Sequence, residues 1–422
     1  MARNMLLVMK FGGTSVADIA RIKNSAFHVK REAEAGNRVV VVVSAMAGHT
    51  NQLVAWTREA HPFHDTREYD AVVSSGEQIT AGLMAIILQS MGVSARSWQG
   101  WQIPLRTDDA HGGARIDRVE AANLLRRLDQ GEVAVVAGFQ GISPRNRITT
   151  LGRGGSDTTA VALAAALKAD RCDIYTDVDG VYTTDPRIVR SARRLPRVSY
   201  EEMLEMASQG AKVLQTRSVE LAMAQGVRVQ VRSSFDPPET CEPARAGMPE
   251  KCGTLVCDET EMLEQHVVSG IAYARDEAKI TVLSIEDKPG VAASIFMPLA
   301  EANINVDMIV QNISEDGRKT DLTFTVAATD LPRALQVLRD RKDTIRFKDL
   351  RGDTDMVKVS VIGVGMRSHA GVAAEMFQAL AEKQINIQAI STSEIKISVL
   401  LGAAHTEAAV KTLHSLFGLD RT

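Results

Sequence analysis

The chain has 422 residues, of which 45% are hydrophobic and 24% are charged, a composition typical of globular protein rather than of disordered or fibrous chains. The length indicates about three domains. A formal net charge of −3 and an isoelectric point near 6.3 give no electrostatic reason to expect nucleic acid or an anionic membrane as partner. A small-molecule ligand is the better expectation.

The N-terminal segment MARNMLLVMKFGG has only five consecutive apolar residues before Lys10, too few for the apolar region of a secretory signal. We therefore expect a cytoplasmic protein. Three of the four cysteines, Cys241, Cys252 and Cys257, fall in one segment without the C-x-x-C spacing of strong zinc sites, and the fourth is Cys172. We expect reduced, unligated thiols and no protein metal site, with a labile metal or redox site as the alternative.

Residues 5 to about 232 alternate short apolar runs with helical patterns. Continuous β-branched runs are typical of strands that are buried on both faces. Their alternation with helices predicts an α/β domain in which a mostly parallel sheet lies between two helical layers. We expect strands at 5–9, 38–45, 132–138 and 227–233, and helices at 16–35, 78–89 and 157–168.

The C-terminal half contains an internal repeat. GVAASIFMPLAEANINVDMI begins at Gly290 and GVAAEMFQALAEKQINIQAI begins at Gly371, with eleven of twenty positions identical at an offset of 81 residues. Each copy follows an apolar strand pattern, which predicts two paired α+β modules. Between residues 236 and 253 periodicity gives way to Pro, Gly and charge, which indicates a linker. The predicted organisation is a catalytic-type domain over 1–235, a linker over 236–262, and modules over 263–345 and 346–422.

KFGGTS, residues 10–15, lies where the first strand gives way to a helix. Two glycines allow close approach of an anion to the backbone, and Lys10 adds a positive charge. The spacing is not that of a P-loop, so a structural turn before a helix is the alternative.

TTLGRGGSDTTA, residues 149–160, places Arg153 in a glycine-rich loop before a helix. Ser156 and Asp157 suit the start of that helix as simple caps. Capping leaves Arg153 unexplained, and an arginine held among glycines suits bidentate capture of a carboxylate or phosphate.

Three further motifs follow predicted strands or open helices: SAMAGHTN at 44–51, SSGEQ at 74–78 and IYTDVDGVYTTDPR at 174–187. Ends of strands are the places where open α/β sheets bind ligands. Capping by Glu77, and Asx turns made by the aspartates of the third motif, are the structural alternatives.

Together these motifs, with VVVSAM, GFQG, EEMLEMASQGAKVL and the repeat pair, resemble the aspartate kinases of the amino acid kinase family over essentially the whole chain. The repeat resembles a pair of ACT domains, the second marked by SHAGV and STSEIKISVL. The resemblance implies an amino acid kinase fold followed by two ferredoxin-like ACT domains. It also implies phosphorylation of the aspartate side-chain carboxylate by ATP, and feedback inhibition by lysine, threonine or both.

The resemblance also implies a role for each motif. Catalytic roles fall to Lys10, Arg153 and Asp157, with Lys10 neutralising charge as the γ-phosphoryl group moves and Asp157 either orienting Lys10 or organising the catalytic centre. Aspartate is expected to lie against Ser44, Thr50, Glu77 and Arg153. ATP is expected to contact Lys10, Gly12, Gly13, Thr176, Asp177, Tyr182, Asp185, Arg187 and Lys212.

No catalytic base is needed, because the aspartate carboxylate is already ionised at neutral pH. Positioning and charge neutralisation remain as the main tasks. Mg²⁺ is expected to be held largely by phosphates and water.

For the effector, the resemblance points to Asp287, Ala292, Asn305, Gln311, Ser368 and Thr392, although Asp287 could simply build a turn before a helix. It also implies a homo-oligomer or an α2β2 assembly through the ACT domains. Two alternatives stay open at this point. One is a kinase for another amino acid such as glutamate, and the other is an amino-acid sensor that has lost catalysis.

Overall fold

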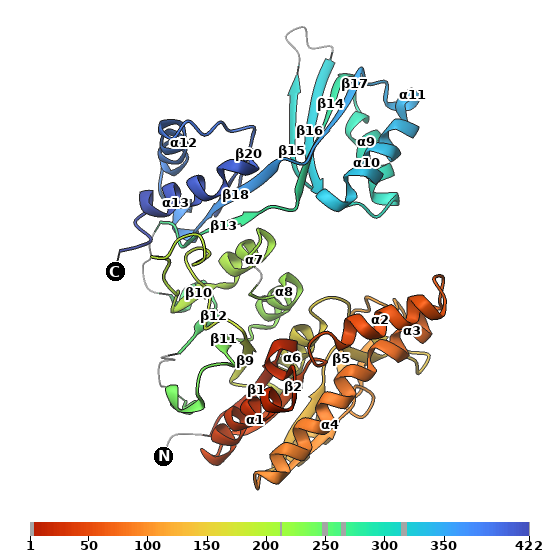
Figure 1. Cartoon of the computed structure of the whole chain (residues 1–422), viewed down its shortest axis with the longest axis vertical. Helices are drawn as coiled ribbons and strands as arrows, with labels where there is room; N and C mark the ends of the chain where they lie inside the picture. Colours follow the sequence, from red (N-terminus) through yellow and green to blue (C-terminus); the bar gives the residue numbers. More distant parts are fainter. Residues whose placement is uncertain (1–3, 212, 247–251, 263–266, 314–318, 422) are drawn as a thin grey trace. The chain divides into compact units, whose positions relative to one another are not determined.

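The computed structural model describes residues 4–211, 213–246, 252–262, 267–313 and 319–421 (Figure 1). The chain divides into two compact units. The first unit comprises Met1–Val181, Arg194–Ala207 and Lys212–Glu264, and the second comprises Tyr182–Arg193, Ser208–Ala211 and Gln265–Thr422.

An eight-stranded sheet forms the centre of the first unit, in the order β10-β12-β11-β9-β1-β2-β6-β3. Every neighbouring pair is parallel except β11 and β12. This confirms the predicted, mostly parallel sheet. The strands are β1 (Leu6–Phe11), β2 (Arg38–Val43), β3 (Ala95–Trp98), β6 (Val133–Ala137), β9 (Arg171–Thr176), β10 (Arg197–Ser199), β11 (Val229–Ser233) and β12 (Thr254–Cys257).

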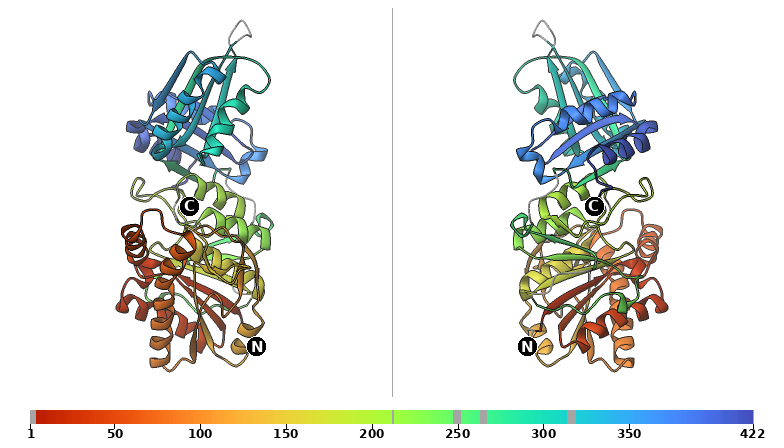
Figure 2. Two further views of the ribbon diagram at one scale, coloured as in Figure 1. Left: turned by 90° about the vertical axis from the view of Figure 1, so that its right-hand side faces the viewer. Right: turned by 90° about the vertical axis from the view of Figure 1, so that its left-hand side faces the viewer.

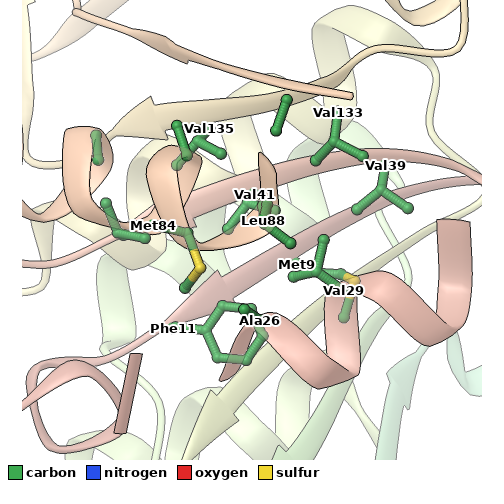
Figure 3. Close-up of a cluster of buried hydrophobic side chains, with 14 of the residues drawn as sticks. Met9, Phe11, Ala26, Val29, Val39, Val41, Met84, Leu88, Val133 and Val135 are labelled. Carbon is green, nitrogen blue, oxygen red and sulfur yellow. The ribbon is translucent and has the colours of Figure 1, made fainter. Parts of the chain in front are cut away.

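Helices on both faces of the sheet give the predicted three layers (Figure 1). On one face α1 (Ile19–Glu34) and α4 (Ser75–Ser90) close an apolar cluster with alternate residues of β1, β2 and β6 (Figure 3). Successive strand residues point to opposite faces, so while Met9 and Phe11 enter this cluster, Lys10 points to the other face. There α6 (Gly155–Leu167) packs against β1 and β9, and α8 (Thr216–Gln225) packs on α6.

A smaller sheet of the first unit has the order β5-β4-β7-β8. Its strands are β4 (Leu105–Thr107), β5 (Ile116–Val119), β7 (Gln140–Ile142) and β8 (Ile148–Thr150), and the remaining helices are α2 (His49–Ala60), α3 (Thr66–Val73), α5 (Ala122–Leu128) and α7 (Tyr200–Ser208). The consecutive helices α3 and α4 together make a stretch, Thr66–Ser90, apolar enough by composition to cross a membrane. More than half of its most apolar window is buried in the fold, as in a core helix.

The segment predicted as a linker, 236–262, is largely part of the first unit. Its residues 254–257 form β12, which lies between β10 and β11 in the large sheet. Further back, the buried carboxylate of Glu32 on α1 accepts a hydrogen bond from the Ala244 amide at 2.9 Å, and Arg31 donates to the Cys241 carbonyl at 3.0 Å. The composition of this segment predicts a loop, but contacts with α1 hold it against the first unit. These contacts cannot be inferred from the sequence.

The prediction of reduced thiols is wrong for Cys241 and Cys252, which form a disulfide with their Cα atoms 6.2 Å apart. Arg31 of α1 holds the Cys241 carbonyl, whereas Gln230 Nε2 of β11 donates to the Cys252 carbonyl at 2.6 Å. These contacts hold the two cysteines, which are eleven positions apart in sequence, close enough for a disulfide. Cys172 and Cys257 are buried and take no part in a disulfide.

The second unit contains two four-stranded antiparallel sheets with helices, as predicted for two ferredoxin-like ACT modules (Figure 2). Module A has the sheet order β15-β16-β14-β17, and module B has β13-β18-β20-β19. Strands of module A are β14 (Glu277–Glu286), β15 (Val306–Ile313), β16 (Lys319–Ala327) and β17 (Asp349–Asp353), with helices α9 (Val291–Glu301), α10 (Leu331–Asp340) and α11 (Lys342–Ile345). Module B comprises β13 (Gly270–Ala274), β18 (Met356–Ile362), β19 (Ala389–Thr392) and β20 (Lys396–Gly402), with α12 (Val372–Glu382) and α13 (Thr406–Leu416). The first repeat helices start at Val291 and Val372, 81 residues apart (372 − 291), as the repeat requires.

The division of strands between the modules does not follow the predicted boundary at residues 345 and 346. β13 precedes all of module A in sequence but pairs with β18 of module B, whereas β17 follows residue 346 and pairs with β14 of module A. Within the second unit the chain therefore first forms a strand of module B, then forms all of module A, and then completes module B. The repeat marks only the strand-helix-strand core of each module, so the flanking edge strands could not be assigned from it.

A buried ion cluster joins the two modules. The Lys358 ammonium, on β18, pairs with the carboxylates of Glu277 and Asp307 on β14 and β15, and its side chain is 3% exposed. Burial alone would lower the pKa of Lys358, but the two carboxylates raise it above its ordinary value. Lys358 is therefore charged and paired at neutral pH.

We expect Lys358→Met to lower the free energy of unfolding by roughly 3 kcal/mol, because it leaves the largely buried carboxylate of Glu277 unpaired. Lys411→Met is the matched control: it removes an exposed pair with Glu407 on α13 and should cost less than about 0.5 kcal/mol. Urea unfolding followed by circular dichroism measures both. Equal losses for the two variants would contradict the structural role given to Lys358.

Candidate active site

A pocket of about 370 Å³ opens beside the ends of β1, β2 and β6 in the first unit. This is the size of many small-molecule sites. The lining combines side chains from motifs that are far apart in sequence. Its residues are Lys10, Gly13, Ser44, Ala45, Met46, Ala47, Gly48, Thr50, Glu77, Phe139, Gly152, Arg153, Gly154, Gly155, Ser156, Asp157 and Gln215.

Lys10 and Asp157 form an ion pair across the pocket wall. Lys10 Nζ lies 2.5 Å from Asp157 Oδ1, and each side chain is only 10% exposed. β1 directs Lys10 toward α6, and Asp157 lies in the first turn of α6. Gly154 is the N-cap residue, and Asp157 occupies a first-turn position where the helix dipole favours a carboxylate while it also pairs with Lys10. A fixed ammonium group thus faces the pocket beside a carboxylate that orients it.

Glu77 supplies a buried carboxylate with one free oxygen. Its Oε1 accepts a hydrogen bond from the Ala45 amide at 3.0 Å, whereas its Oε2 is buried and has no hydrogen-bond partner within the described part of the chain. Gly76 makes this approach possible, because a Cβ there would lie 2.7 Å from the Ala45 side chain. Burial raises the pKa of Glu77 to about 7. A cation from a ligand would satisfy Oε2 and favour the ionised form.

Arg153 stands in a glycine loop at the start of α6. Gly152 and Gly154 have φ values of 74° and 72°, which are left-handed conformations that a side chain disfavours. Arg153 is exposed, and the structure shows no hydrogen bond or ion pair between it and any other described residue. Its guanidinium is therefore available for a carboxylate or phosphate.

Ser44, which directly follows β2, and Thr50, in the first turn of α2, also line the pocket. Gly12 and Gly13 lead from β1 into a short 3₁₀ turn, Gly13–Val16. A Cβ on Gly12 would lie 3.3 Å from Lys10 Nζ, and Gly13 lines the pocket. The structure thus collects all predicted aspartate contacts and the predicted phosphate-binding lysine and glycines around one cavity.

The residues predicted for the rest of the nucleotide are divided between the two units. Thr176 ends β9 and donates a hydrogen bond to Asp177, and both belong to the first unit. Tyr182, Asp185 and Arg187 belong to the second unit. Lys212 lies outside the described residues. The nucleotide-binding role of all six stays a prediction.

The predicted effector residues belong to the second unit. Asp287 is half-buried, and the other five are exposed: Ala292, Asn305, Gln311, Ser368 and Thr392. Asp287 and Ser368 are equivalent in the repeat (368 − 287 = 81), as are Gln311 and Thr392 (392 − 311 = 81). Their role in binding stays a prediction.

Sequence reasoning missed two pocket residues, Phe139 and Gln215. Phe139 has a φ of 68°, and its carbonyl accepts from the Leu151 amide at 2.9 Å, which holds the loop before Arg153. Phe139 lies in the motif GFQG between β6 and β7, and its left-handed backbone, of a kind that is often found at ligand sites, is not visible in the sequence. Gln215 packs its side chain against Gly154 from the start of α8 and has no comparable sequence signal.

Comparisons with known proteins match this arrangement. The model of the amino acid kinase family matches residues 5–233, and ACT domain models match 279–343 and 359–417. An aspartate kinase of Stutzerimonas stutzeri is 52% identical over 416 residues, covering 98% of each chain, and an aspartokinase of Pseudomonas aeruginosa is 52% identical over 417 residues with the same coverage. The crystal structure of E. coli aspartokinase III in complex with aspartate and ADP has a TM-score of 0.77 and 31% identity, covering 97% of this chain and 99% of that one.

The chain therefore belongs to the amino acid kinase family and carries two C-terminal ACT domains. Within that family it is a member of the aspartate kinases.

The raised pKa of Glu77 predicts a pH dependence of aspartate binding. The ammonium group of aspartate needs the ionised form of the Glu77 carboxylate. With a pKa of about 7, Glu77 is increasingly protonated as the pH falls below 7, and it must then lose this proton before aspartate binds. We expect the KM for aspartate to rise about tenfold from pH 8 to pH 6, while the carboxylates of aspartate itself stay ionised. Steady-state kinetics across this range measures the effect.

Glu77→Gln is the matched control, because it keeps the shape and cannot ionise. Its KM for aspartate should be high and nearly independent of pH. A variant with the same pH dependence as the parent enzyme would show that another group titrates.

Proposed function

We propose that the chain catalyses the ATP-dependent phosphorylation of the side-chain carboxylate of L-aspartate, giving 4-phospho-L-aspartate. The observation that carries this proposal is the pocket that combines the unpartnered Oε2 of Glu77, the free guanidinium of Arg153 and the Lys10–Asp157 pair. E. coli aspartokinase III, a structural relative at 31% identity, was solved with aspartate and ADP, which supports the same substrate here.

The polar groups of the pocket suit the three charged groups of aspartate. Glu77 Oε2 would accept the ammonium group, and Arg153 would hold one carboxylate by paired hydrogen bonds. The second carboxylate then lies toward Lys10 as the nucleophile. Because the nucleophile is already ionised, the enzyme needs orientation rather than a base.

Lys10 would stabilise the oxygens that gain charge during transfer, and Asp157 would hold the lysine in place. Mg²⁺ accompanies ATP in this proposal and, when bound, neutralises phosphate charge. Phosphate oxygens and water would hold most of its coordination sphere. The residues present fit a nucleotide whose phosphates carry the Mg²⁺. The ammonium of Lys10 and the backbone amides of the turn at Gly12 and Gly13 suit the phosphate oxygens as hydrogen-bond donors.

The reaction would be the first step in the biosynthesis of lysine, threonine and methionine, in the cytoplasm. We propose feedback inhibition by lysine, threonine or both at the ACT domains, and a homo-oligomer or α2β2 assembly through them. The E. coli relative has also been solved with lysine and aspartate, with a TM-score of 0.76 at 31% identity, which supports lysine as one candidate.

A segment of the predicted nucleotide motif offers a route for this inhibition. Three hydrogen bonds hold residues 182–193 on module B. Ile271 N donates to Thr183 O at 2.7 Å, and Thr183 Oγ1 lies 2.9 Å from His414 Nε2. Tyr273 OH donates to the Asp185 carboxylate at 2.9 Å. Val189 is buried in the core of that module. The chain on either side, up to Val181 and from Arg194, belongs to the first unit. A change in module B would therefore act directly on this segment.

The proposed reaction predicts hydroxylamine-trappable acyl phosphate from aspartate, ATP and Mg²⁺, but not from glutamate. Lys10→Met should lower kcat roughly 10³-fold, because it removes the cation that stabilises transferring charge. Lys23→Met is a matched control on α1 outside the pocket and should leave kcat unchanged. Turnover of glutamate would favour a different amino acid kinase. Amino-acid binding without any turnover would favour the sensor hypothesis.

The proposed route predicts that Tyr273→Phe weakens feedback inhibition. The effector concentration for half inhibition should rise several-fold, because one hydrogen bond between module B and the segment 182–193 is lost. Titration with lysine and threonine, singly and together, measures it. Tyr200→Phe, which removes a 2.8 Å hydrogen bond to Val227 inside the first unit, is the control. Unchanged inhibition in Tyr273→Phe would exclude this contact from the route.

A further inference from the structure

A buried carboxylate that the proposed reaction does not use lies behind the pocket. Asp70, on α3, has no exposed surface, and the described partners of its carboxylate lie in the loop between β4 and β5 and at the end of β8. Its carboxylate accepts from the Gly112 amide at 3.1 Å and from Thr150 Oγ1 at 2.5 Å. His111 Nδ1 lies 2.7 Å from Asp70 Oδ2, so the imidazole and the carboxylate share a hydrogen bond.

The two segments that Asp70 joins, the β4–β5 loop and the end of β8, are also in contact with each other. Ala114 N donates to Thr150 O at 2.9 Å, and the guanidinium of Arg217 donates to the carbonyls of Leu151 and Ala114 at 2.6 and 2.8 Å. A Cβ on Gly152 would lie 3.4 Å from the Gly112 carbonyl. The loop around His111 therefore packs directly against Gly152.

Gly152 directly precedes Arg153, the exposed guanidinium of the pocket. Within the described residues Arg153 has no hydrogen bond or ion pair of its own, so its position depends on the backbone that carries it. Thr150 lies three residues before it, and Gly112 packs against the residue next to it. Asp70 thus contacts the Arg153 loop directly at Thr150 and indirectly through Gly112.

We propose that Asp70 and His111 are positioning residues for substrate binding: the Asp70–His111–Thr150 cluster holds the Gly152–Gly154 loop so that Arg153 faces the aspartate carboxylate. The inference rests on the proposed function, because it assigns Arg153 to the substrate. Neither Asp70 nor His111 lines the pocket, so neither is a catalytic residue. A loop displaced by about 1 Å is enough to cost a large factor in such a site.

A positioning role changes the KM for aspartate selectively, whereas a purely structural role lowers stability without a selective change in that KM. Asp70→Asn loses acceptor capacity and presents an amide NH₂ to donors, so we expect the KM for aspartate to rise about tenfold while the KM for ATP changes less than about twofold. Asp173→Asn is the matched control, since Asp173 is equally buried but pairs with Arg171 and Arg232 away from the pocket. It should lower stability without a selective change in the KM for aspartate.

A second pair of variants decides the matter if Asp70→Asn fails to fold. His111→Asn retains an amide N–H near the imidazole Nδ1 position and should keep the KM for aspartate within about threefold of the parent enzyme, whereas His111→Phe should raise it about tenfold. Equal values for the two His111 variants, or parallel changes in both KM values, would overturn the positioning role. Absence of aspartate phosphorylation in the parent enzyme would instead overturn the proposed function.

Discussion

The ion pair between Lys10 and Asp157 is the interaction on which the geometry of the pocket depends. It exists because β1 alternates: one set of side chains enters the apolar cluster under α1 and α4, and the other set meets α6. A charge near the end of a buried strand, such as Lys10 in β1, is costly unless it is paired. The same pair that makes Lys10 tolerable in the sheet therefore fixes its ammonium group at the edge where the other pocket residues converge.

Much of the first unit could be predicted, because continuous β-branched runs and the helices between them carry a strong periodic signal. The strands at 38–43, 133–137 and 229–233 lie within the predicted ranges. Pocket residues such as Glu77 and Arg153 were found because they stand in short motifs at strand ends. Gln215 was missed because it reaches the pocket only through the packing of α8, which no local pattern encodes.

The errors share one physical cause, which is that partners distant in sequence decide the outcome. Residues 236–246 look like a linker, yet Glu32 and Arg31 dock them on α1, and there Cys241 meets Cys252, which Gln230 holds. In the same way Asp70 resembles any polar residue of an amphipathic helix. Only the folded chain brings His111 and Thr150 to it, so its contribution to the Arg153 loop could not be inferred from spacing.

The exchanged edge strands have a consequence for how the regulatory half can be divided. A cut between residues 345 and 346 would deprive module A of β17 and module B of β13, exposing unpaired backbone on β14 and β18. The two repeats look like tandem copies in the sequence, but each module takes an edge strand from the other side of the boundary between them. The two modules therefore form one folding unit that cannot be divided at that boundary. A natural or engineered fragment that keeps the sheets of both modules complete must contain both repeats and begin before Gly270.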